Sequence, residues 1–176
     1  MAGLVLVLGS PAAGQPLDSD VLAVLQGPPP PVAPEVVSRD RQGQATVRAT
    51  RLRAPLQIDG RLDEPVYETV QSITDFIQQL PDEGALGSER TEAWVLFDPE
   101  KIYVSARVWD PAPPSAWVAN EMRRDTSQLR ENDVFWAIFD TFLDRRNGIA
   151  FYTNPLGALG DFAFTNEGSP NGDWNP

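Results

Sequence analysis

The feature that most constrains the fold is a pair of β-prone runs joined by a four-residue turn. Residues 91–97 and 102–109 are rich in β-branched and aromatic side chains, which favour strands. Between them lies Asp98-Pro99-Glu100-Lys101, and a proline at the second position of a turn presets the backbone angle that a type I turn requires. The sequence therefore predicts an antiparallel hairpin.

The two faces of the second run differ in character. One face carries aliphatic side chains: Ile102, Val104, Ala106 and Val108. The other carries polar and aromatic side chains: Tyr103, Ser105, Arg107 and Trp109. Because side chains alternate along a strand, we expect the first face to pack in the core and the second to be exposed or to line a site.

Three further strands are predicted after the hairpin. The run 133–140 is rich in large apolar side chains, and it is followed by Asn147-Gly148, a strong short-range signal for a hairpin turn. Residues 149–153 and 160–164 complete the series. Many short strands with little helix predict an all-β, antiparallel β-sandwich of the immunoglobulin-like or jelly-roll type.

Before the hairpin, strand and turn signals surround one helical turn. Residues 48–52 favour a strand, and residues 59–60 favour a turn. We expect a short helix through residues 66 and 67, with Asp63 as its N-cap and Pro65 in its first turn.

The first 45 residues differ in composition from the rest of the chain. Leu4 to Leu8 are followed by small residues, as in a secretory signal peptide, so residues 1–15 are predicted to be a partial signal peptide. Residues 16–45 contain the consecutive prolines 28–31 and no sustained apolar period, which predicts a Pro-rich linker. We therefore expect the folded domain to span residues 46–176. We also expect the protein to be secreted, periplasmic or associated with an outer membrane.

Composition narrows the chemistry further. The net charge of −11 disfavours nucleic acid as a partner, because phosphates are bound by clustered lysine and arginine. The chain contains no cysteine and no histidine, which excludes thiolate chemistry, the usual general base and the commonest transition-metal ligand. Catalysis would have to rest on carboxylates, and the sequence carries no nucleophile elbow, phosphate-binding glycine loop or metalloprotease motif. We therefore predict that this chain is not an enzyme.

Four segments, in order along the chain, carry a resemblance to a known family. They are residues 58–67 (IDGRLDEPVY), residues 91–104, residues 140–147 (DTFLDRRN) and residues 151–157 (FYTNPLG). Together they resemble carbohydrate-binding modules of family 9. The resemblance is greatest to the subgroup that precedes a domain of unknown function similar to an outer-membrane β-barrel. It covers residues 48–167 and implies a β-sandwich that binds glucan- or xylan-type saccharides, in some members with structural calcium.

In sugar-binding members of this family, a tryptophan stacks on the sugar, and a glutamate and an arginine bond its hydroxyl groups. The matching positions here are Arg130, Trp136 and Tyr152, so the resemblance keeps none of the three residue types. A second stacking tryptophan of the family corresponds to sequence beyond Pro176. We therefore expect the sandwich to be incomplete at its C-terminal end.

A saccharide site at other positions is compatible with the sequence. A pyranose presents an apolar face to an aromatic ring, and Trp109, Trp136 and Tyr152 are the candidate platforms. Arg107 and Asn154 are the candidate hydrogen-bonding partners. The alternative is that these rings pack in the core, where large aromatic side chains are common.

The acidic residues are best interpreted as structural. Turn and cap positions are predicted for Asp59, Asp63 and Glu64, and strand ends for Asp110, Asp140 and Asp161. A calcium ion takes about six to eight oxygen ligands, and the EF-hand spacing is absent from the sequence. The candidate calcium ligands are Asp133, Asp140 and Asp144.

The sequence thus predicts a non-catalytic carbohydrate-binding module linked to polysaccharide breakdown, whose partner is an oligo- or polysaccharide. The alternative is a structural or interaction domain attached to an outer-membrane β-barrel, without sugar binding. Loss of the three matched ligand positions favours the alternative, whereas the family resemblance favours the module. Any glycoside hydrolase activity is expected in a longer parent protein.

Overall fold

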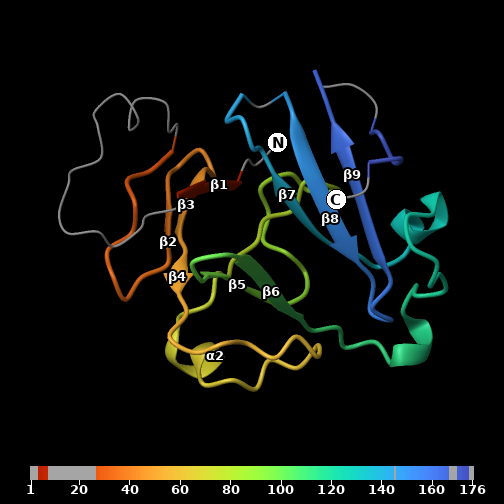
Figure 1. The fold of residues 1–176 in the computed structure, drawn as a ribbon, viewed down its shortest axis with the longest axis horizontal. Helices are drawn as coiled ribbons and strands as arrows, with labels where there is room; N and C mark the ends of the chain where they lie inside the picture. Colours follow the sequence, from red (N-terminus) through yellow and green to blue (C-terminus); the bar gives the residue numbers. More distant parts are fainter. Residues whose placement is uncertain (1–3, 8–26, 145, 167–169, 175–176) are drawn as a thin grey trace. The chain divides into compact units, whose positions relative to one another are not determined.

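The computed structural model describes residues 4–7, 27–144, 146–166 and 170–174. The chain divides into two compact units, Met1–Asp110 and Pro111–Pro176. Secondary structure is almost entirely β, which confirms the predicted all-β class (Figure 1). Among the residues described, no helix has the length and apolar character needed to cross a bilayer.

In its described residues, the first unit has two three-stranded sheets. Their strands are β1 Leu4–Val7, β2 Val37–Arg39, β3 Ala45–Arg48, β4 Thr50–Arg51, β5 Thr91–Phe97 and β6 Ile102–Val108. In the first sheet, β3 pairs in parallel with β1 and antiparallel with β2. In the second, β5 pairs in parallel with β4 and antiparallel with β6. The strand predicted at 48–52 is therefore divided between the two sheets, with Ala49 between β3 and β4.

The predicted hairpin is confirmed. Strands β5 and β6, of seven residues each, pair along their whole length. The carboxylate of Asp98 closes the turn by accepting hydrogen bonds from the backbone N–H groups of Glu100 and Lys101, at 2.8 Å each. Strand β5 lies between β4 and β6, and its residues 92–96 are buried.

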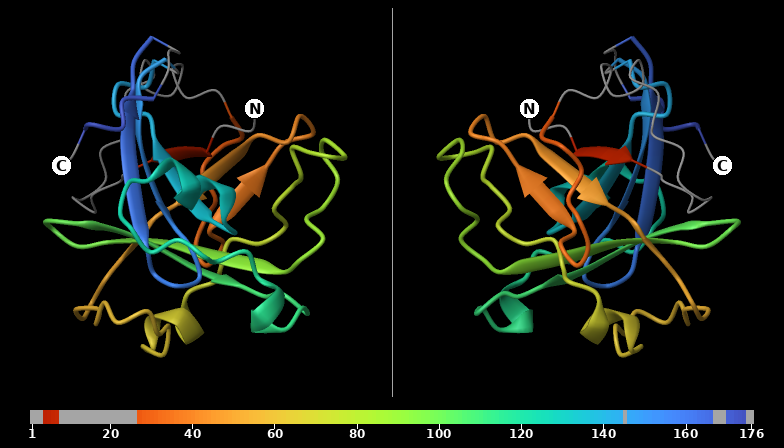
Figure 2. Two further views of the ribbon diagram at one scale, coloured as in Figure 1. Left: turned by 90° about the vertical axis from the view of Figure 1, so that its right-hand side faces the viewer. Right: turned by 90° about the vertical axis from the view of Figure 1, so that its left-hand side faces the viewer.

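One face of the hairpin packs against the first sheet. The core consists of Val36, Val47, Ile73, Ala93 and Val95, with Ala106 partly buried against it. Figure 2 shows the hairpin between this sheet and the short helix α2, Val66–Thr69. The aliphatic face of β6 contributes Ala106 to the core as predicted, but Ile102 and Val108 at its ends are exposed. The reason is length, since the four residues of β3 cannot cover a hairpin whose strands have seven.

The folded unit begins before residue 45, which is the predicted end of the linker. Val36 is buried in the core, β2 pairs with β3, and the Thr46 hydroxyl donates to the Pro28 carbonyl at 2.5 Å. Residues 36–45 therefore belong to the folded unit, because two adjacent valines supply a strand that the proline density concealed. Of the predicted signal peptide, Leu4–Val7 forms β1, and the rest lies outside the described residues together with residues 16–26.

The predicted helical turn is confirmed as α2, but Asp63 is not its cap. Pro65 occupies the N-cap position without a side-chain hydrogen bond, whereas Asp63 lies 3.0 Å from the Arg61 guanidinium. A helix of four residues is too short to be stable by itself. It is held in place by Tyr67, whose hydroxyl lies 2.8 Å from the Ser105 hydroxyl on β6.

In its described residues, the second unit has one antiparallel sheet in the order β7-β8-β9. The strands are β7 Phe135–Phe139, β8 Gly148–Thr153 and β9 Leu159–Phe164, and they confirm the three strands predicted after the hairpin. Two 3-10 helices precede the sheet, η1 Pro114–Ala116 and η2 Ser127–Glu131. The core of this unit consists of Leu129, Ala150, Tyr152, Ala158 and Phe162.

Candidate functional site

The polar face of the β5–β6 hairpin brings together two of the predicted site residues, Arg107 and Trp109. The backbone N–H of Trp109 donates to the Arg90 carbonyl at 3.0 Å, so these two residues stand opposite each other just beyond the paired strands. Glu92 stands opposite Arg107, one step along the same face. We call these four residues the Arg90–Trp109 patch.

Glu92 holds both arginines of the patch. Its carboxylate lies 2.5 Å from Arg90 Nη2 and 3.7 Å from Arg107 Nη1, and its side chain is only 12% exposed. The Cζ atom of Arg90 lies 4.4 Å from the centroid of the Trp109 ring, and that of Arg107 lies 5.8 Å from it. Trp109 is half-buried, and two guanidinium groups flank its ring.

Burial decreases along this face toward Trp109. In the middle of β5, Trp94 is buried and its indole N–H donates to the Val70 carbonyl at 3.1 Å. At the Trp109 end, the side chains of Arg107 and Arg90 are 40% and 67% exposed. A ligand therefore has access to the face at its Trp109 end.

The other predicted platforms pack together in the second unit. Trp136 stacks on Tyr152, with ring centroids 4.4 Å apart and planes at 15°, and it meets Phe162 edge to face at 5.7 Å. Tyr152 is buried, which raises the pKa of its hydroxyl, and its ring crosses Gly160, where an added Cβ would lie 2.2 Å from Tyr152 Cζ. Arg130 lies over Phe162, with Cζ 5.8 Å from the ring centroid. Trp136 and Tyr152 thus serve each other as packing partners.

Asn154 is engaged within the protein. Its Nδ2 group donates to the Glu121 carbonyl at 2.7 Å and to Asn132 Oδ1 at 3.1 Å. Its Oδ1 atom accepts hydrogen bonds from the backbone N–H groups of Leu156 and Ala158, at 3.1 and 3.0 Å. A sugar-binding amide needs polar atoms that are free for the ligand, so Asn154 is a structural residue in this protein.

The predicted calcium ligands do not come together. Asp133 precedes β7, whereas Asp140 and Asp144 follow it, so the strand separates them by roughly 20 Å. Asp133 accepts a hydrogen bond from the Val118 N–H at 2.8 Å, and Asp144 accepts one from the Arg146 N–H, which lowers the pKa of Asp144. In the described part of the chain, no three Asp, Glu, His or Cys side chains form a group that would hold a metal ion. The structure thus places Asp133 apart from Asp140 and Asp144, and their contribution to a calcium site stays a prediction.

Glu121 was not singled out by the sequence, yet it organises the loop before β7. It is buried, and its carboxylate accepts the backbone N–H groups of Met122 and Arg123 at 2.9 and 2.7 Å. The Arg123 guanidinium lies 2.7 Å from Glu121 Oε2. The side-chain hydrogen bond from Arg123 and the backbone N–H groups lower the pKa of Glu121 to about 2.

Asp161 also differs from its predicted role at a strand end. It lies within β9, is buried, and accepts a hydrogen bond from the Arg124 guanidinium. Its backbone N–H donates to Asp125 Oδ1 at 2.9 Å. A buried carboxylate normally requires a paired cation, and Arg124 meets this requirement here.

Sequence reasoning missed Arg90 and Glu92, although the signal was present. Glu92 lies on β5, and Arg90 lies just before this strand. Both are on the hairpin face to which side-chain alternation assigns Arg107 and Trp109. Pairing the two runs outward from the Asp98 turn would have placed Glu92 opposite Arg107.

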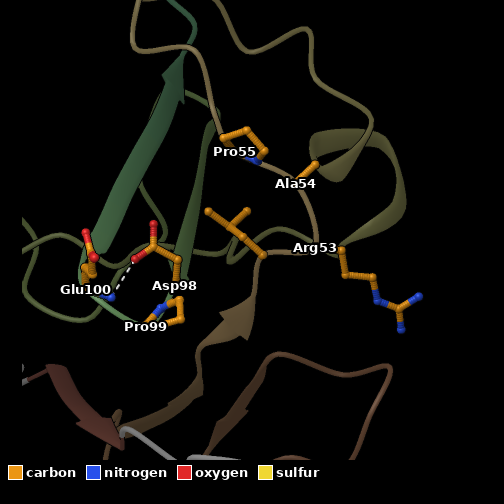
Figure 3. Close-up of a pocket in the computed structure, with 7 residues that line it drawn as sticks. Arg53, Ala54, Pro55, Asp98, Pro99 and Glu100 are labelled. Carbon is orange, nitrogen blue, oxygen red and sulfur yellow. Dashed lines mark hydrogen bonds between the residues drawn. The ribbon is translucent and has the colours of Figure 1, made fainter.

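A hollow of about 310 Å³ lies beside the hairpin turn, lined by Leu52, Arg53, Ala54, Pro55, Asp98, Pro99 and Glu100 (Figure 3). The Arg53 side chain extends away from Asp98 and Glu100. The Asp98 carboxylate accepts the Tyr103 hydroxyl at 2.7 Å, and this hydrogen bond and those within the turn lower its pKa. Because this carboxylate is engaged in the turn, the Arg90–Trp109 patch is better equipped to bind a ligand.

Comparisons with protein-family models, with curated proteins and with solved structures found no match to this chain. The resemblance to family 9 modules therefore rests on the four sequence segments, and the function has to be argued from the geometry of the patch.

Proposed function

We propose that this chain is a non-catalytic carbohydrate-binding module and that the Arg90–Trp109 patch is its saccharide site. One observation carries the proposal: a half-buried tryptophan shares the accessible end of a strand face with two guanidinium groups and a carboxylate. A pyranose offers an apolar C–H face to an aromatic ring and hydroxyl groups to charged hydrogen-bonding partners. The patch supplies both kinds of contact.

Binding displaces Arg90 from the ring. The Arg90 side chain is 67% exposed, so little packing opposes its movement. A cation–π contact at such an exposed position is worth about 0.5–1 kcal/mol, which a stacked sugar ring can replace. The saccharide then stacks on Trp109, while Arg107 donates hydrogen bonds to its hydroxyl groups.

The composition of the patch supports binding without cleavage. Glycoside hydrolysis normally uses two carboxyl groups that face each other across the scissile bond. Glu92 is the one carboxylate of the patch, and it is held by two arginines. We propose a location outside the cytoplasm, secreted, periplasmic or associated with an outer membrane, on the sequence resemblance to family 9 modules.

The proposal is tested by titrating the whole chain with cellohexaose and xylohexaose, followed by calorimetry and tryptophan emission. We expect Trp109→Ala to weaken binding by about tenfold or more, because it removes the stacking platform. We expect its unfolding free energy to fall by less than the ~3 kcal/mol typical of a core aromatic. The matched control is Trp117→Ala, which removes another partly exposed tryptophan, located in the second unit.

Two results would contradict the proposal. One is the absence of binding to every oligosaccharide tested, neutral or acidic, at millimolar concentration. The other is equal loss of affinity in the Trp109 and Trp117 variants. A loss of stability above ~3 kcal/mol in Trp109→Ala would instead place that ring in the core.

A second candidate function is a structural or interaction domain of a larger outer-membrane protein. The observation that favours it is the commitment of Trp136, Tyr152 and Asn154 to internal contacts. These side chains stabilise the second unit and leave no polar group of Asn154 for a sugar. This function predicts no response in any oligosaccharide titration.

A further inference from the structure

We infer that the saccharide bound at the Arg90–Trp109 patch carries a carboxylate, as a uronic acid residue does. The inference rests on the proposed function and adds a ligand class to it. It starts from the charge of the patch. Two guanidinium groups face the single carboxylate of Glu92, so the patch has a net charge of +1. The chain as a whole carries −11, so the patch is a positive spot on an acidic protein.

Burial divides the charges of the patch unequally. The negative charge is the buried one, because the Glu92 side chain is 12% exposed. The positive charges face solvent, with Arg90 67% and Arg107 40% exposed. An incoming ligand therefore meets guanidinium groups first. Neutral hydroxyl groups do not require this excess of positive charge, whereas a carboxylate gains from it.

Arg90 is the group best placed to take the carboxylate. In the described part of the chain, its side chain makes one hydrogen bond, from Nη2 to Glu92 Oε1 at 2.5 Å. A guanidinium has five N–H donors in a planar fork that matches a carboxylate in a bidentate pair. Arg107 is more constrained, because its Nη2 donates to the Leu62 carbonyl at 2.9 Å. When a uronate ring stacks on Trp109, the carboxylate of the uronate lies on the side of Arg90.

The test compares acidic and neutral oligosaccharides of equal length on the whole chain. Trigalacturonate and a glucuronate-substituted xylotriose are titrated beside cellotriose and xylotriose, with sodium acetate as a probe for a free carboxylate. We expect the acidic oligosaccharides to bind about tenfold more tightly than the neutral ones, since they add a charge-assisted pair. Raising NaCl from about 0.05 to 0.5 M should reduce this preference, because the pair is exposed to solvent.

Variants assign the preference to one side chain. Arg90→Gln should remove this preference, because it should weaken the binding of acidic oligosaccharides about tenfold more than that of neutral ones. Arg90→Lys keeps the positive charge but loses the planar fork of N–H donors. It should therefore retain part of the preference for acidic oligosaccharides. Arg61→Gln is the matched control, because Arg61 is a similarly exposed, ion-paired arginine of the same unit. Thermal melts show whether each variant is folded.

The outcomes separate this inference from the function on which it rests. Equal affinity for acidic and neutral oligosaccharides would overturn the carboxylate preference and leave the saccharide site intact. Absence of binding to all oligosaccharides would overturn both. Acetate that competes as well as trigalacturonate would show an anion site without sugar recognition, which also contradicts both. Preference that survives in Arg90→Gln would overturn the assignment to Arg90.

Discussion

At the residue scale, the role of each aromatic side chain depends on the residue that stands opposite it. Tyr152 pairs with Gly160, whose missing side chain lets the tyrosine ring lie flat across the sheet and stack on Trp136. Trp109 stands opposite Arg90, which covers its ring without burying it. Residue type alone does not distinguish the two cases, so a structural ring and a ligand platform look alike in the sequence.

The position of Asn154 in its network leads to a stability prediction. We expect Asn154→Ala to lower the unfolding free energy by about 2–4 kcal/mol, because each buried partner left without a hydrogen bond costs about 1–3 kcal/mol. Urea denaturation at pH 7 measures the change. The control is Asn120→Ala, an exposed amide of the same network whose Oδ1 accepts a hydrogen bond from Asn132 at 3.0 Å. A loss below ~1 kcal/mol for Asn154→Ala would show that the network is not important for stability.

At the element scale, strands whose signals are local were predictable and pairings that join distant segments were not. The β5–β6 hairpin follows from Asp98-Pro99 beside alternating runs. The β7–β8 hairpin was predicted from Asn147-Gly148, but Gly148 is the first residue of β8 and residues 140–147 connect the two strands. The parallel pairings of β1 with β3 and of β4 with β5 join distant segments and have no turn signal between them. Alternation identified Arg107 and Trp109, but Arg90 and Glu92 required the cross-strand register.

The loop that precedes β7 gives a prediction for acid stability. The pKa of Glu121 is lowered from 4.5 to about 2 in the folded protein, first by Arg123 and then by backbone N–H groups. A lowered folded pKa means that this carboxylate stabilises the fold above pH 4.5, and the contribution is lost as pH falls from 4.5 toward 2. Glu121→Gln should therefore flatten the pH dependence of the unfolding free energy in this window and reduce stability at pH 7.

Urea denaturation at several pH values across this window measures the effect. Glu131→Gln is the matched control, since Glu131 is an exposed glutamate of the same unit. If the unfolding free energy of Glu121→Gln depends on pH as steeply as that of the wild-type chain, the acid sensitivity of the unit comes from other carboxylates.

At the scale of the whole molecule, small sheets leave apolar edges. Over the residues that the structure describes, the sheet of the second unit has three strands, and β7, with the sequence Phe-Trp-Ala-Ile-Phe, lies at its edge. A strand without charge, proline or glycine at an edge is a template for pairing with another chain. Asp133 and Asp140 flank it, and the net charge of −11 opposes association between copies. The balance between edge pairing and charge repulsion sets the oligomeric state.

We expect the chain to self-associate through antiparallel pairing of β7 with β7 of a second copy. With Ala137 opposite its counterpart, Phe135 meets Phe139 and Trp136 meets Ile138, so large apolar side chains pair across the strands. Sedimentation velocity should show a dimer fraction that rises with protein concentration and with NaCl, because salt screens the repulsion.

The decisive variant is Ile138→Lys, which places a charge on an edge-strand side chain that is 53% exposed. The control Ile58→Lys makes the same charge change at a side chain of the first unit that is 78% exposed. Both variants lower the net negative charge by one, which by itself favours association. A fall in the dimer fraction with Ile138→Lys alone therefore identifies the β7 edge. Equal behaviour of the two variants, or a monomer under all conditions, would show that β7 does not pair between copies.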